Sequence, residues 1–292
     1  MNPLVSVIIP SYNSSRFIQE TIDSVLNQSF KNFEVIIVDD GSTDGQFDLI
    51  FAFCQKDERV RYIYQQNRGV ASARNAGFNH SSGNYVAFLD ADDIWLPENL
   101  SAKLAKFEER EYGLVHSDGY FIDENSGIKE GLMVGEEGML LIDLLEWKKT
   151  QVPGPSSILV KRKVLEEIGP FDTNLSTSAD LDFFLRVASR FIIGRVQKPT
   201  WKYRLHDYNM HKNILRMERD MLYVYKKASL NNLFKSSWFK RKSYSTLYII
   251  LAASWAGDGK NSFRATYFVG RAILVNPWSL IDIIQRISRK WF

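Results

Sequence analysis

The segment Tyr85-Val-Ala-Phe-Leu-Asp-Ala-Asp-Asp93 is the part of this chain that decides its fold and its chemistry. Its first half has the composition of a buried strand, and its second half brings three carboxylates to the end of that strand. Neighbouring carboxylates repel each other and resist desolvation unless a cation lies beside them. Oxygen ligands in a loop at a strand end suit Mg²⁺ or Mn²⁺, which bridge a few carboxylates to bound phosphates. The alternative is an acidic turn in which Asp93 caps a helix that begins in Leu96-Pro-Glu-Asn99.

Two segments nearer the N-terminus repeat this design of an apolar strand that ends in a polar loop. Val5–Ile9 is an apolar, mainly β-branched run that stops at Pro10-Ser-Tyr-Asn13. Phe33–Val38 has the same character and stops at Asp39-Asp-Gly-Ser-Thr-Asp-Gly45. Runs of this length and composition, bounded by turn residues, predict buried strands.

Helices are predicted between these strands. Apolar residues recur at helical spacing over 16–28 and over 48–55. Apolar strands that alternate with amphipathic helices are typical of a parallel sheet covered on both faces. In such sheets, ligands bind where loops leave the carboxyl ends of the strands. The loops that contain Tyr12, Asp39 and Asp92 are therefore expected to meet at one site.

Four motifs follow one another in the first third of the chain: Ser6-Val-Ile-Ile-Pro-Ser-Tyr-Asn13, Val38-Asp-Asp-Gly-Ser-Thr-Asp-Gly45, Asn67-Arg-Gly-Val-Ala-Ser-Ala-Arg-Asn-Ala-Gly77 and Phe88-Leu-Asp-Ala-Asp-Asp93. Together they resemble the family 2 glycosyltransferases. The resemblance implies the α/β GT-A (nucleotide-diphospho-sugar transferase) fold, with a mainly parallel sheet flanked by helices. It also implies an inverting mechanism and a divalent metal held by a D-x-D motif. Similarity continues through Gly154-Pro-Ser-Ser157, Ile168-Gly-Pro-Phe-Asp172, Ala179-Asp180 and Tyr203-Arg-Leu-His206. The ordered set is specific for the family and not for the sugar.

The resemblance assigns six residues to the donor site: Pro10, Tyr12, Asp39, Arg74, Asp90 and Asp92. It implies that Tyr12 offers an aromatic face, and Asp39 a carboxylate acceptor, to uracil when the nucleotide is UDP. The forked donor geometry of Arg74 suits a phosphate or a carboxylate of the same site. Asp92 is expected to contact the metal and the diphosphate, with Asp90 close to the ribose or supporting the ligands.

These assignments have structural alternatives. Tyr12 is also compatible with an aromatic residue that packs within its loop, and Asp39 with an Asx-type turn. For Arg74 the alternative is a surface salt bridge, and Arg68 is the second choice for the same role. Asp40 is expected to form a turn or to support the site from behind.

Displacement with inversion needs a carboxylate that takes the proton of the acceptor hydroxyl while a metal stabilises the leaving diphosphate. The resemblance makes Asp180 this base, at the start of an expected helix where the family shows a Glu-Asp pair and this chain has Ala179. Asp182 is the alternative base, and a charge favoured by the helix dipole is the structural alternative for Asp180. His206 is a second expected ligand of the metal or diphosphate, with a structural histidine as its alternative.

Length and composition predict a catalytic domain with an appendage. The chain has 292 residues, 45% of them hydrophobic, which is ample for a large core. Residues 1–207 are expected to form the GT-A catalytic domain, with a nucleotide-binding half at 1–93 and an acceptor half at 94–207. Glycine-rich residues 113–153 are expected to supply acceptor-side loops that order over the donor. Residues 208–292 are expected to form a basic helical region.

Charge is divided unevenly between these parts. Residues 208–292 carry 15 Lys or Arg and 4 Asp or Glu, a net charge of +11, whereas residues 1–207 carry a net charge of −8. Basic residues interleaved with Trp, Phe and Ile in helices are typical of an interfacial surface that binds anionic membranes. The alternatives are helices that pack on the catalytic domain with solvated Lys and Arg faces, and helices that form an oligomer. Nucleic acid is not an expected partner, although a basic patch of this composition is compatible with one.

The family resemblance, with which these patterns agree, implies a metal-dependent inverting glycosyltransferase of the hexosyltransferase type. It is expected to take a nucleotide-diphospho-sugar, most simply a UDP-sugar, with Mn²⁺ or Mg²⁺ as cofactor. A saccharide or lipid-linked acceptor in surface polysaccharide synthesis is expected. Two alternatives stay open: a catalytically silent nucleotide-binding scaffold of the same fold, favoured by Ala179, and a metal-dependent phosphohydrolase that uses the loop of Asp90 and Asp92.

The single cysteine bears on the compartment. Cys54 lies in a helical pattern and has no partner for an internal disulfide, which fits a reducing cytoplasm. No secretory signal peptide is expected, and the apolar run at 247–256 is too short to cross a bilayer. The protein is therefore expected in the cytoplasm, peripheral at the inner face of the cytoplasmic membrane.

Overall fold

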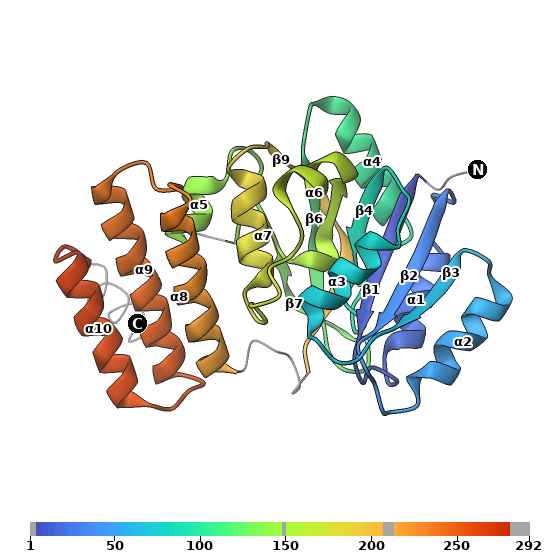
Figure 1. Cartoon of the computed structure of the whole chain (residues 1–292), viewed down its shortest axis with the longest axis horizontal. Helices are drawn as coiled ribbons and strands as arrows, with labels where there is room; N and C mark the ends of the chain where they lie inside the picture. The colour runs from blue at the N-terminus through green and yellow to red at the C-terminus, as the bar shows by residue number, and fades with distance from the viewer. Residues whose placement is uncertain (1–3, 148–149, 207–212, 281–292) are drawn as a thin grey trace. The chain divides into compact units, whose positions relative to one another are not determined.

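The computed structural model describes residues 4–147, 150–206 and 213–280. The described residues form two compact units (Figure 1). We call residues 4–140 and 150–206 the α/β unit, and residues 141–147 and 213–280 the helical unit.

The strands of the α/β unit form one mixed sheet, and they are β1 (Val5–Ser11), β2 (Phe33–Asp39), β3 (Val60–Tyr64), β4 (Tyr85–Phe88), β5 (Ile94–Trp95), β6 (Leu114–Ile122), β7 (Ile128–Met133), β8 (Ile158–Lys161) and β9 (Ile193–Arg204). Their order is β3-β2-β1-β4-β8-β6-β9-β5, with β7 paired to β6. Strands β3, β2, β1 and β4 pair in parallel, as expected from the sequence. In the remainder only β6 and β9 pair in parallel, and β8, β5 and β7 run antiparallel to their neighbours. The α/β class is thus confirmed, and the parallel arrangement is complete only in the first half of the sheet.

The helices of the α/β unit are α1 (Ile18–Leu26), α2 (Gln46–Lys56), α3 (Val70–Asn79), α4 (Asn99–Glu109), α6 (Arg162–Ile168) and α7 (Ala179–Ala188), with a 3₁₀ turn at Pro155–Ser157. Helices α1 and α2 confirm the helices predicted over 16–28 and 48–55. The cap of α4 is Glu98, and Asp93 precedes β5, so the alternative of Asp93 as the cap of this helix is wrong.

Helix α3 lies close against β1 because small residues face the strand. A Cβ added to Gly77 would lie 2.4 Å from Cγ2 of Ile8, so only glycine permits this approach. The helix follows Gly69, whose φ of 87° lies in the region that favours glycine. This packing carries Arg74, in the middle of α3, to the first half of the sheet.

The glycine-rich segment over 113–153 contains more regular structure than the expected loops. It supplies β6, most of which is buried, and the exposed strand β7. A Cβ added to Gly119 of β6 would lie 2.6 Å from the indole of Trp201, so this glycine makes room for a core ring. Glycine here serves close packing between strands as well as turns.

The helical unit consists of α5 (Leu141–Glu146), α8 (Ile214–Leu230), α9 (Ser237–Ala256) and α10 (Ser262–Val275). Helix α5 falls in the expected acceptor half, but it packs here: the Tyr225 hydroxyl donates to the Leu145 carbonyl at 2.7 Å, and Lys242 pairs with Glu146 at 2.7 Å. The apolar run at 247–256 lies in α9 and contributes to the core of this unit. Within the residues that the structure describes, no helix has both the length and the hydropathy needed to span a membrane.

Candidate active site

The register of the parallel strands brings their carboxyl ends to one edge of the sheet. Ser11 at the end of β1 pairs with Asp39 at the end of β2, and Ile8 pairs with Phe88 at the end of β4. Tyr12 follows β1 directly and is half exposed, with 52% of its surface accessible. The loops of Tyr12 and Asp39 and the acidic loop after β4 therefore leave the same edge, as predicted.

The Asp39 carboxylate is buried and held in place from two sides. Its Oδ1 accepts a hydrogen bond from the Ser42 amide at 2.9 Å, and its Oδ2 accepts one from the Tyr62 hydroxyl at 2.9 Å. Burial and the carboxylate of Asp39 both raise the pKa of Tyr62, so this hydroxyl stays a donor. A carboxylate has about four acceptor positions. The Ser42 contact spans three residues, one more than an Asx turn, and the carboxylate retains acceptor capacity for a base N–H. Pro10 lies buried in β1, two residues before Tyr12.

The neighbouring Asp40 shapes the loop that leads into α3. This buried carboxylate accepts hydrogen bonds from the amides of Arg68 and Gly69, both at 2.8 Å, and from the Gln65 side chain at 2.7 Å. Asp40 therefore supports the loop from behind, as expected. The side chain of Arg68 is exposed.

Arg74 and Asp90 form an ion pair at the same edge. Nη2 of Arg74 donates to Oδ1 of Asp90 at 2.6 Å, and the guanidinium lies 5.4 Å from the ring centroid of Phe171. The Arg74 side chain is 6% exposed and that of Asp90 is 32% exposed. The pair is thus largely buried on the arginine side, which excludes the surface salt bridge. The Ser156 hydroxyl accepts from the Asp90 amide at 3.1 Å and fixes the backbone of this loop.

Asp92 and His206 come from loops far apart in the chain and meet at the end of the sheet. Nε2 of His206 lies 2.8 Å from Oδ2 of Asp92, and the imidazole stacks on Phe17 with 5.4 Å between ring centroids. Among the described residues, no group of three or more His, Cys, Asp or Glu could hold a metal ion. Mg²⁺ and Mn²⁺ commonly take one or two protein ligands and complete their shell with substrate phosphates and water. A carboxylate and an imidazole in contact fit such an ion.

Asp93 is the buried member of the acidic loop. Burial raises its pKa well above the ordinary value, and the charges of Asp92 and Asp90 add to this effect. Its Oδ1 accepts a hydrogen bond from the Arg204 amide at 3.0 Å. This contact ties the loop to the end of β9, two residues before His206.

Asp180 stands in the first turn of α7, where the sequence predicts a helix start. Its Oδ1 accepts from the Leu181 amide at 2.8 Å. Burial raises the pKa of Asp180, the positive charge of Arg74 opposes this rise, and the negative charge of Asp90 adds to it. The carboxylate is therefore close enough to the Arg74–Asp90 pair for each charge to act on it.

Asp182 is engaged elsewhere. Its Oδ2 accepts from Nε of Arg186 at 2.9 Å, and the Asp182 side chain is 4% exposed. Arg186 in turn donates to the carbonyls of Ile168 and Gly169. Asp182 therefore anchors α7 to the loop after α6, and the geometry favours Asp180 over Asp182 as the base.

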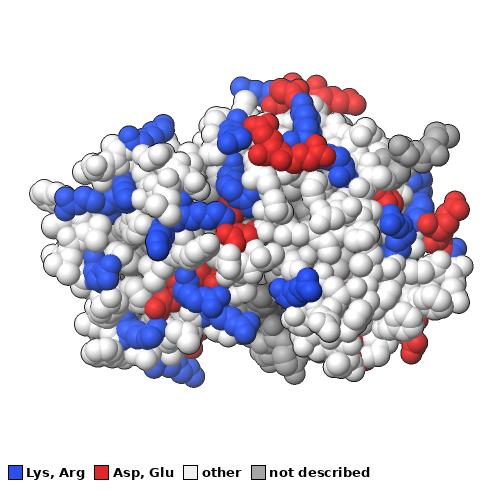
Figure 2. All heavy atoms as spheres, viewed as in Figure 1, with Lys and Arg blue, Asp and Glu red and all other residues white. Residues whose placement is uncertain are grey.

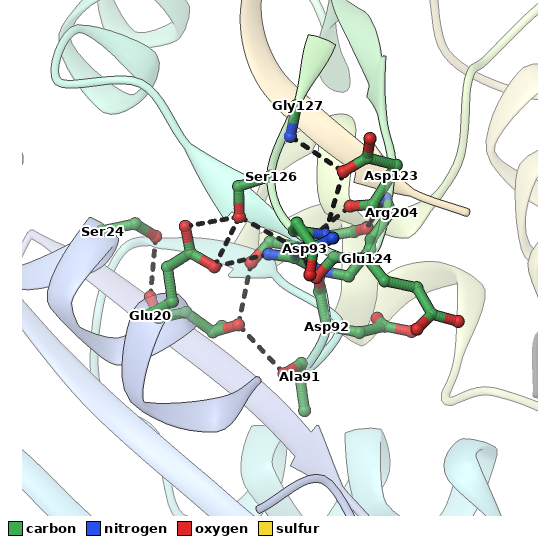
Figure 3. A network of polar contacts seen from close by, with 12 residues as sticks. Glu20, Ser24, Ala91, Asp92, Asp93, Asp123, Glu124, Ser126, Gly127 and Arg204 are labelled. Carbon is green, nitrogen blue, oxygen red and sulfur yellow. Dashed lines mark hydrogen bonds and ion pairs between the residues drawn. The ribbon is translucent and has the colours of Figure 1, made fainter. Parts of the chain in front are cut away.

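Sequence reasoning missed a residue that organises this edge. Arg204 is 1% exposed and bonds to the acidic loop, to α1 and to the turn after β6 (Figure 3). The available signal was an arginine at the end of a strand, two residues before His206. Two of its partners, Ser126 and Glu20, lie 78 and 184 residues away in the chain, where no local pattern points to them.

Comparison with known proteins agrees with this architecture. The model of the family described as "Glycosyl transferase family 2" matches residues 6–169. The chain is 32% identical over 246 residues to the "Putative teichuronic acid biosynthesis glycosyltransferase TuaG" of Bacillus subtilis, a match that covers 81% of this chain and 92% of that protein. It is 35% identical over 206 residues to an uncharacterized glycosyltransferase of Rickettsia bellii, covering 70% of this chain and 29% of the relative. The chain thus spans about a third of the length of the Rickettsia relatives.

Two solved structures share the fold at low identity. The crystal structure of S. aureus TarS 1-349 in complex with UDP-GlcNAc has a TM-score of 0.67 and 19% identity, covering 94% of this chain and 81% of TarS 1-349. The mannosyltransferase PcManGT from Pyrobaculum calidifontis, in complex with GDP-Man and Mn²⁺, has a TM-score of 0.61 and 18% identity, covering 96% of this chain and 88% of its own. These likenesses establish the GT-A fold. Since the family model covers more than half of the residues, and the Bacillus subtilis relative matches along nearly its whole length, this chain belongs to glycosyl transferase family 2.

Proposed function

We propose that this protein is a metal-dependent, inverting glycosyltransferase that moves a sugar from a UDP-linked donor to a saccharide or lipid-linked acceptor in surface polysaccharide synthesis. The observation that carries the proposal is the meeting of Asp92 with His206 beside the Arg74–Asp90 pair, at the edge that Tyr12 and Asp39 also reach. The UDP-GlcNAc bound to the S. aureus neighbour supports a UDP-sugar, and the name of the Bacillus subtilis relative supports a cell-surface polymer.

Each residue has a role in this proposal. Tyr12 stacks on the base, and Asp39 accepts a hydrogen bond from it. Arg74 holds Asp90 toward the ribose. Asp92 and His206 hold Mn²⁺ or Mg²⁺, which neutralises the leaving diphosphate when bound.

Asp180 is the general base in this scheme. It takes the proton of the acceptor hydroxyl as the oxygen attacks the anomeric carbon from the face opposite the diphosphate. Burial favours the neutral carboxyl group and so raises the pKa of Asp180 toward the range of an effective base. Asp182 is held by Arg186 and takes no part in proton transfer.

A turnover assay separates the proposal from its alternatives. The protein is incubated with a panel of UDP- and GDP-sugars and Mn²⁺, with and without saccharide and lipid-linked acceptors. A transferase releases the nucleotide mainly when an acceptor is present, a phosphohydrolase releases it without one, and a silent scaffold shows neither reaction. Calorimetric titration with UDP, with and without Mn²⁺, adds the binding step. Affinity for UDP that is the same with and without Mn²⁺ would remove the metal from the proposal.

A second proposal concerns the helical unit: it binds an anionic membrane surface at the inner face of the cytoplasmic membrane. Residues 213–280 carry 11 Lys or Arg and 3 Asp or Glu, and Figure 2 shows Lys and Arg outnumbering acidic side chains over these helices. One stripe of α10 and the turn after it is 50–85% exposed and apolar, and consists of Phe263, Tyr267, Leu274 and Trp278. Residues 262–280 contain no acidic residue. Exposed aromatic rings on a cationic helix suit the headgroup region of an anionic bilayer.

Some cations of this unit have internal partners and are less suited to such binding. Lys240 donates to the Ser229 hydroxyl, Lys242 pairs with Glu146, and Arg241 donates to a backbone carbonyl of α10 at 2.7 Å. These three contacts all lie within the helical unit. Co-sedimentation of the full chain with phosphatidylglycerol vesicles and with phosphatidylcholine vesicles tests the proposal. Failure to bind phosphatidylglycerol at low salt, together with a dimer in sedimentation, would favour self-association through α10.

A further inference from the structure

Arg204 is a buried cation at the point where three parts of the α/β unit meet. Its side chain is 1% exposed, and its Nε donates to the Asp92 carbonyl at 2.8 Å. Its Nη2 donates to Glu20 of α1 at 2.6 Å, and its Nη1 donates to the Ser126 hydroxyl at 3.0 Å. Nη1 also lies 3.2 Å and 3.1 Å from the carbonyls of Asp123 and Glu124. Figure 3 shows these groups around the guanidinium, with Glu20 on helix α1 and the others on the acidic loop and the turn after β6.

The partners of Arg204 also bond to one another, so the contacts form a network rather than a single ion pair. Glu20 also accepts from the Ser126 hydroxyl at 2.8 and 2.9 Å, which joins α1 to the turn after β6. Next to Glu20, the Thr21 hydroxyl lies 3.0 Å from the Ala91 carbonyl and 2.9 Å from the Asp93 carbonyl. The acidic loop is therefore fixed by its backbone on both sides of Asp92, without use of the Asp92 side chain, which contacts His206. Removing Arg204 would take this donor from the carbonyls of Asp92, Asp123 and Glu124.

The same arginine acts on the second candidate metal ligand through Phe17. The Arg204 guanidinium lies 4.7 Å from the ring centroid of Phe17, and the His206 imidazole stacks on that ring at 5.4 Å. The Phe17 ring is therefore in contact with both the Arg204 guanidinium and the His206 imidazole, and its position constrains the plane of the imidazole. The His206 side chain is 8% exposed and has little freedom to turn.

We propose that Arg204, with Glu20 and Phe17, is a positioning device that presets Asp92 and His206 for one divalent metal ion. It rests on the proposed function, because it presumes that these two residues are the ligands. Groups that orient metal ligands from behind contribute about 10–100-fold to metal affinity. Arg204 is suited to this role because its planar fork can hold the Asp92 carbonyl, Glu20 and the β6–β7 turn at fixed relative positions, whereas a lysine can hold only part of this set.

The test measures Mn²⁺ binding directly, apart from catalysis. The free Mn²⁺ signal in electron paramagnetic resonance is followed during titration of the full chain in the presence of saturating UDP. Arg204→Lys keeps the charge but loses the fork, and should weaken Mn²⁺ binding by about tenfold or more. UDP affinity measured without metal should stay near that of the wild type, since Tyr12 and Asp39 contact the base.

Milder variants cover the case in which Arg204→Lys does not fold. Glu20 is 46% exposed, so Glu20→Gln should leave the fold intact and weaken Mn²⁺ binding severalfold. Phe17→Leu keeps an apolar side chain, removes the stack on His206 and should act in the same direction. Arg162→Lys is the matched control, because Arg162 also donates to a backbone carbonyl, at 2.6 Å, and lies over a phenylalanine ring, but far from the acidic loop in sequence and contacts.

The outcomes separate the two proposals. Weaker Mn²⁺ binding in the Arg204, Glu20 and Phe17 variants, with Arg162→Lys unchanged, supports the positioning role. Unchanged Mn²⁺ affinity in folded Glu20→Gln and Phe17→Leu overturns it while the proposed function stands. If the wild type binds no Mn²⁺ in the presence of UDP, the metal-dependent function and the positioning role both fall.

Discussion

The α/β unit and the helical unit carry their charges in different ways. In the α/β unit, charged groups such as Arg74, Asp93 and Arg204 are buried and are bonded to groups from other elements of the fold. In the helical unit, cations greatly outnumber acids and one apolar stripe of α10 faces solvent. Buried charges act at short range in a low dielectric and are little affected by salt, whereas exposed charges act weakly, add up and are screened. Substitutions should therefore have large, specific effects in the first unit and small, salt-dependent effects in the second.

The largest effect is expected at Asp180. Asp180→Asn keeps the shape of the side chain and removes its ability to accept a proton, so kcat should fall by roughly 10²–10⁴-fold with donor affinity near that of the wild type. Asp182→Asn is the matched variant, since Asp182 is paired with Arg186 and should affect stability more than kcat. Initial rates at saturating donor and acceptor give kcat, and calorimetric titration with UDP measures the affinity of the donor site. If the Asp180→Asn protein keeps most of its kcat, Asp180 is not the general base and another carboxylate takes this role.

The second prediction concerns the pH dependence of the same group. Burial raises the pKa of Asp180 and the charge of Arg74 lowers it. A base works when ionised, so kcat should rise with pH through this pKa. Arg74→Gln removes the lowering charge, and the acidic limb of the kcat profile should move to higher pH. The exposed Arg68→Gln serves as control, and a limb that moves equally in both variants, or moves to lower pH, would contradict the assignment.

The third prediction concerns a buried lysine of the α/β unit and measures stability. Lys103 is fully buried, donates to Oδ1 of Asn99 at 2.8 Å, and has a pKa well below its ordinary value because burial penalises the charged form. Between the lowered pKa of the folded state and the ordinary pKa near 10.5, the unfolded chain binds more protons than the folded one. The free energy of unfolding therefore gains a contribution that rises with pH in this window.

Lys103→Met should remove this pH-dependent contribution to the free energy of unfolding. In thermal unfolding between pH 7 and 10, the stability of the variant relative to the wild type should be greatest at the lower pH. This difference in stability should shrink as the pH rises. Lys163→Met is the control, because the Lys163 side chain is 70% exposed. A difference between wild type and Lys103→Met that stays constant with pH would mean that Lys103 is charged in the folded protein.

How far the sequence predicts this molecule depends on whether the signal is local. Strands β1, β2 and β4 and helices α1 and α2 follow from apolar runs, helical spacing and turn residues close together in the chain. Strand β6 does not, because its interior contains buried polar residues. Ser117 accepts from the Thr200 hydroxyl at 2.7 Å and Asp118 pairs with Arg195 at 2.7 Å, so their partners are about 80 residues away. Because these polar residues interrupt the apolar run, the sequence of β6 does not show the pattern that predicts a buried strand.

The site shows the same division. Asp90, Asp92 and His206 can be named from short motifs, and their expected edge of the sheet follows from strand direction. The choice between Asp180 and Asp182 needed the Arg186 contact, and the role of Arg204 needed its contacts with the acidic loop, with α1 and with the turn after β6. Arg204 lies inside a recognisable motif, but its contacts are long-range. The sequence around it therefore does not indicate its role.

The smallest effects are expected in the helical unit, where salt is the diagnostic variable. Each Lys or Arg near an anionic surface adds about 1 kcal/mol of attraction, which fades as ionic strength rises. Replacing Lys240, Arg241 and Lys242 with Glu should weaken capture by phosphatidylglycerol vesicles at low salt, in part through loss of their internal contacts. Such a loss is ambiguous on its own, so the exposed rings provide the sharper comparison.

Phe263→Ser with Trp278→Ser removes two rings that are 85% and 75% exposed, and should leave the fold intact because they contribute little to the core. Apolar insertion is not screened by salt, so this pair should lower capture at every salt concentration, whereas loss of cations should lower it mainly at low salt. Phe51→Ser in the α/β unit, where the ring is 45% exposed, is the matched control and should change nothing. If Phe51→Ser lowers capture as much as the α10 pair does, membrane binding is not confined to the helical unit. The proposed contrast, between buried and bonded charges in the α/β unit and an exposed membrane-binding surface in the helical unit, would then be wrong.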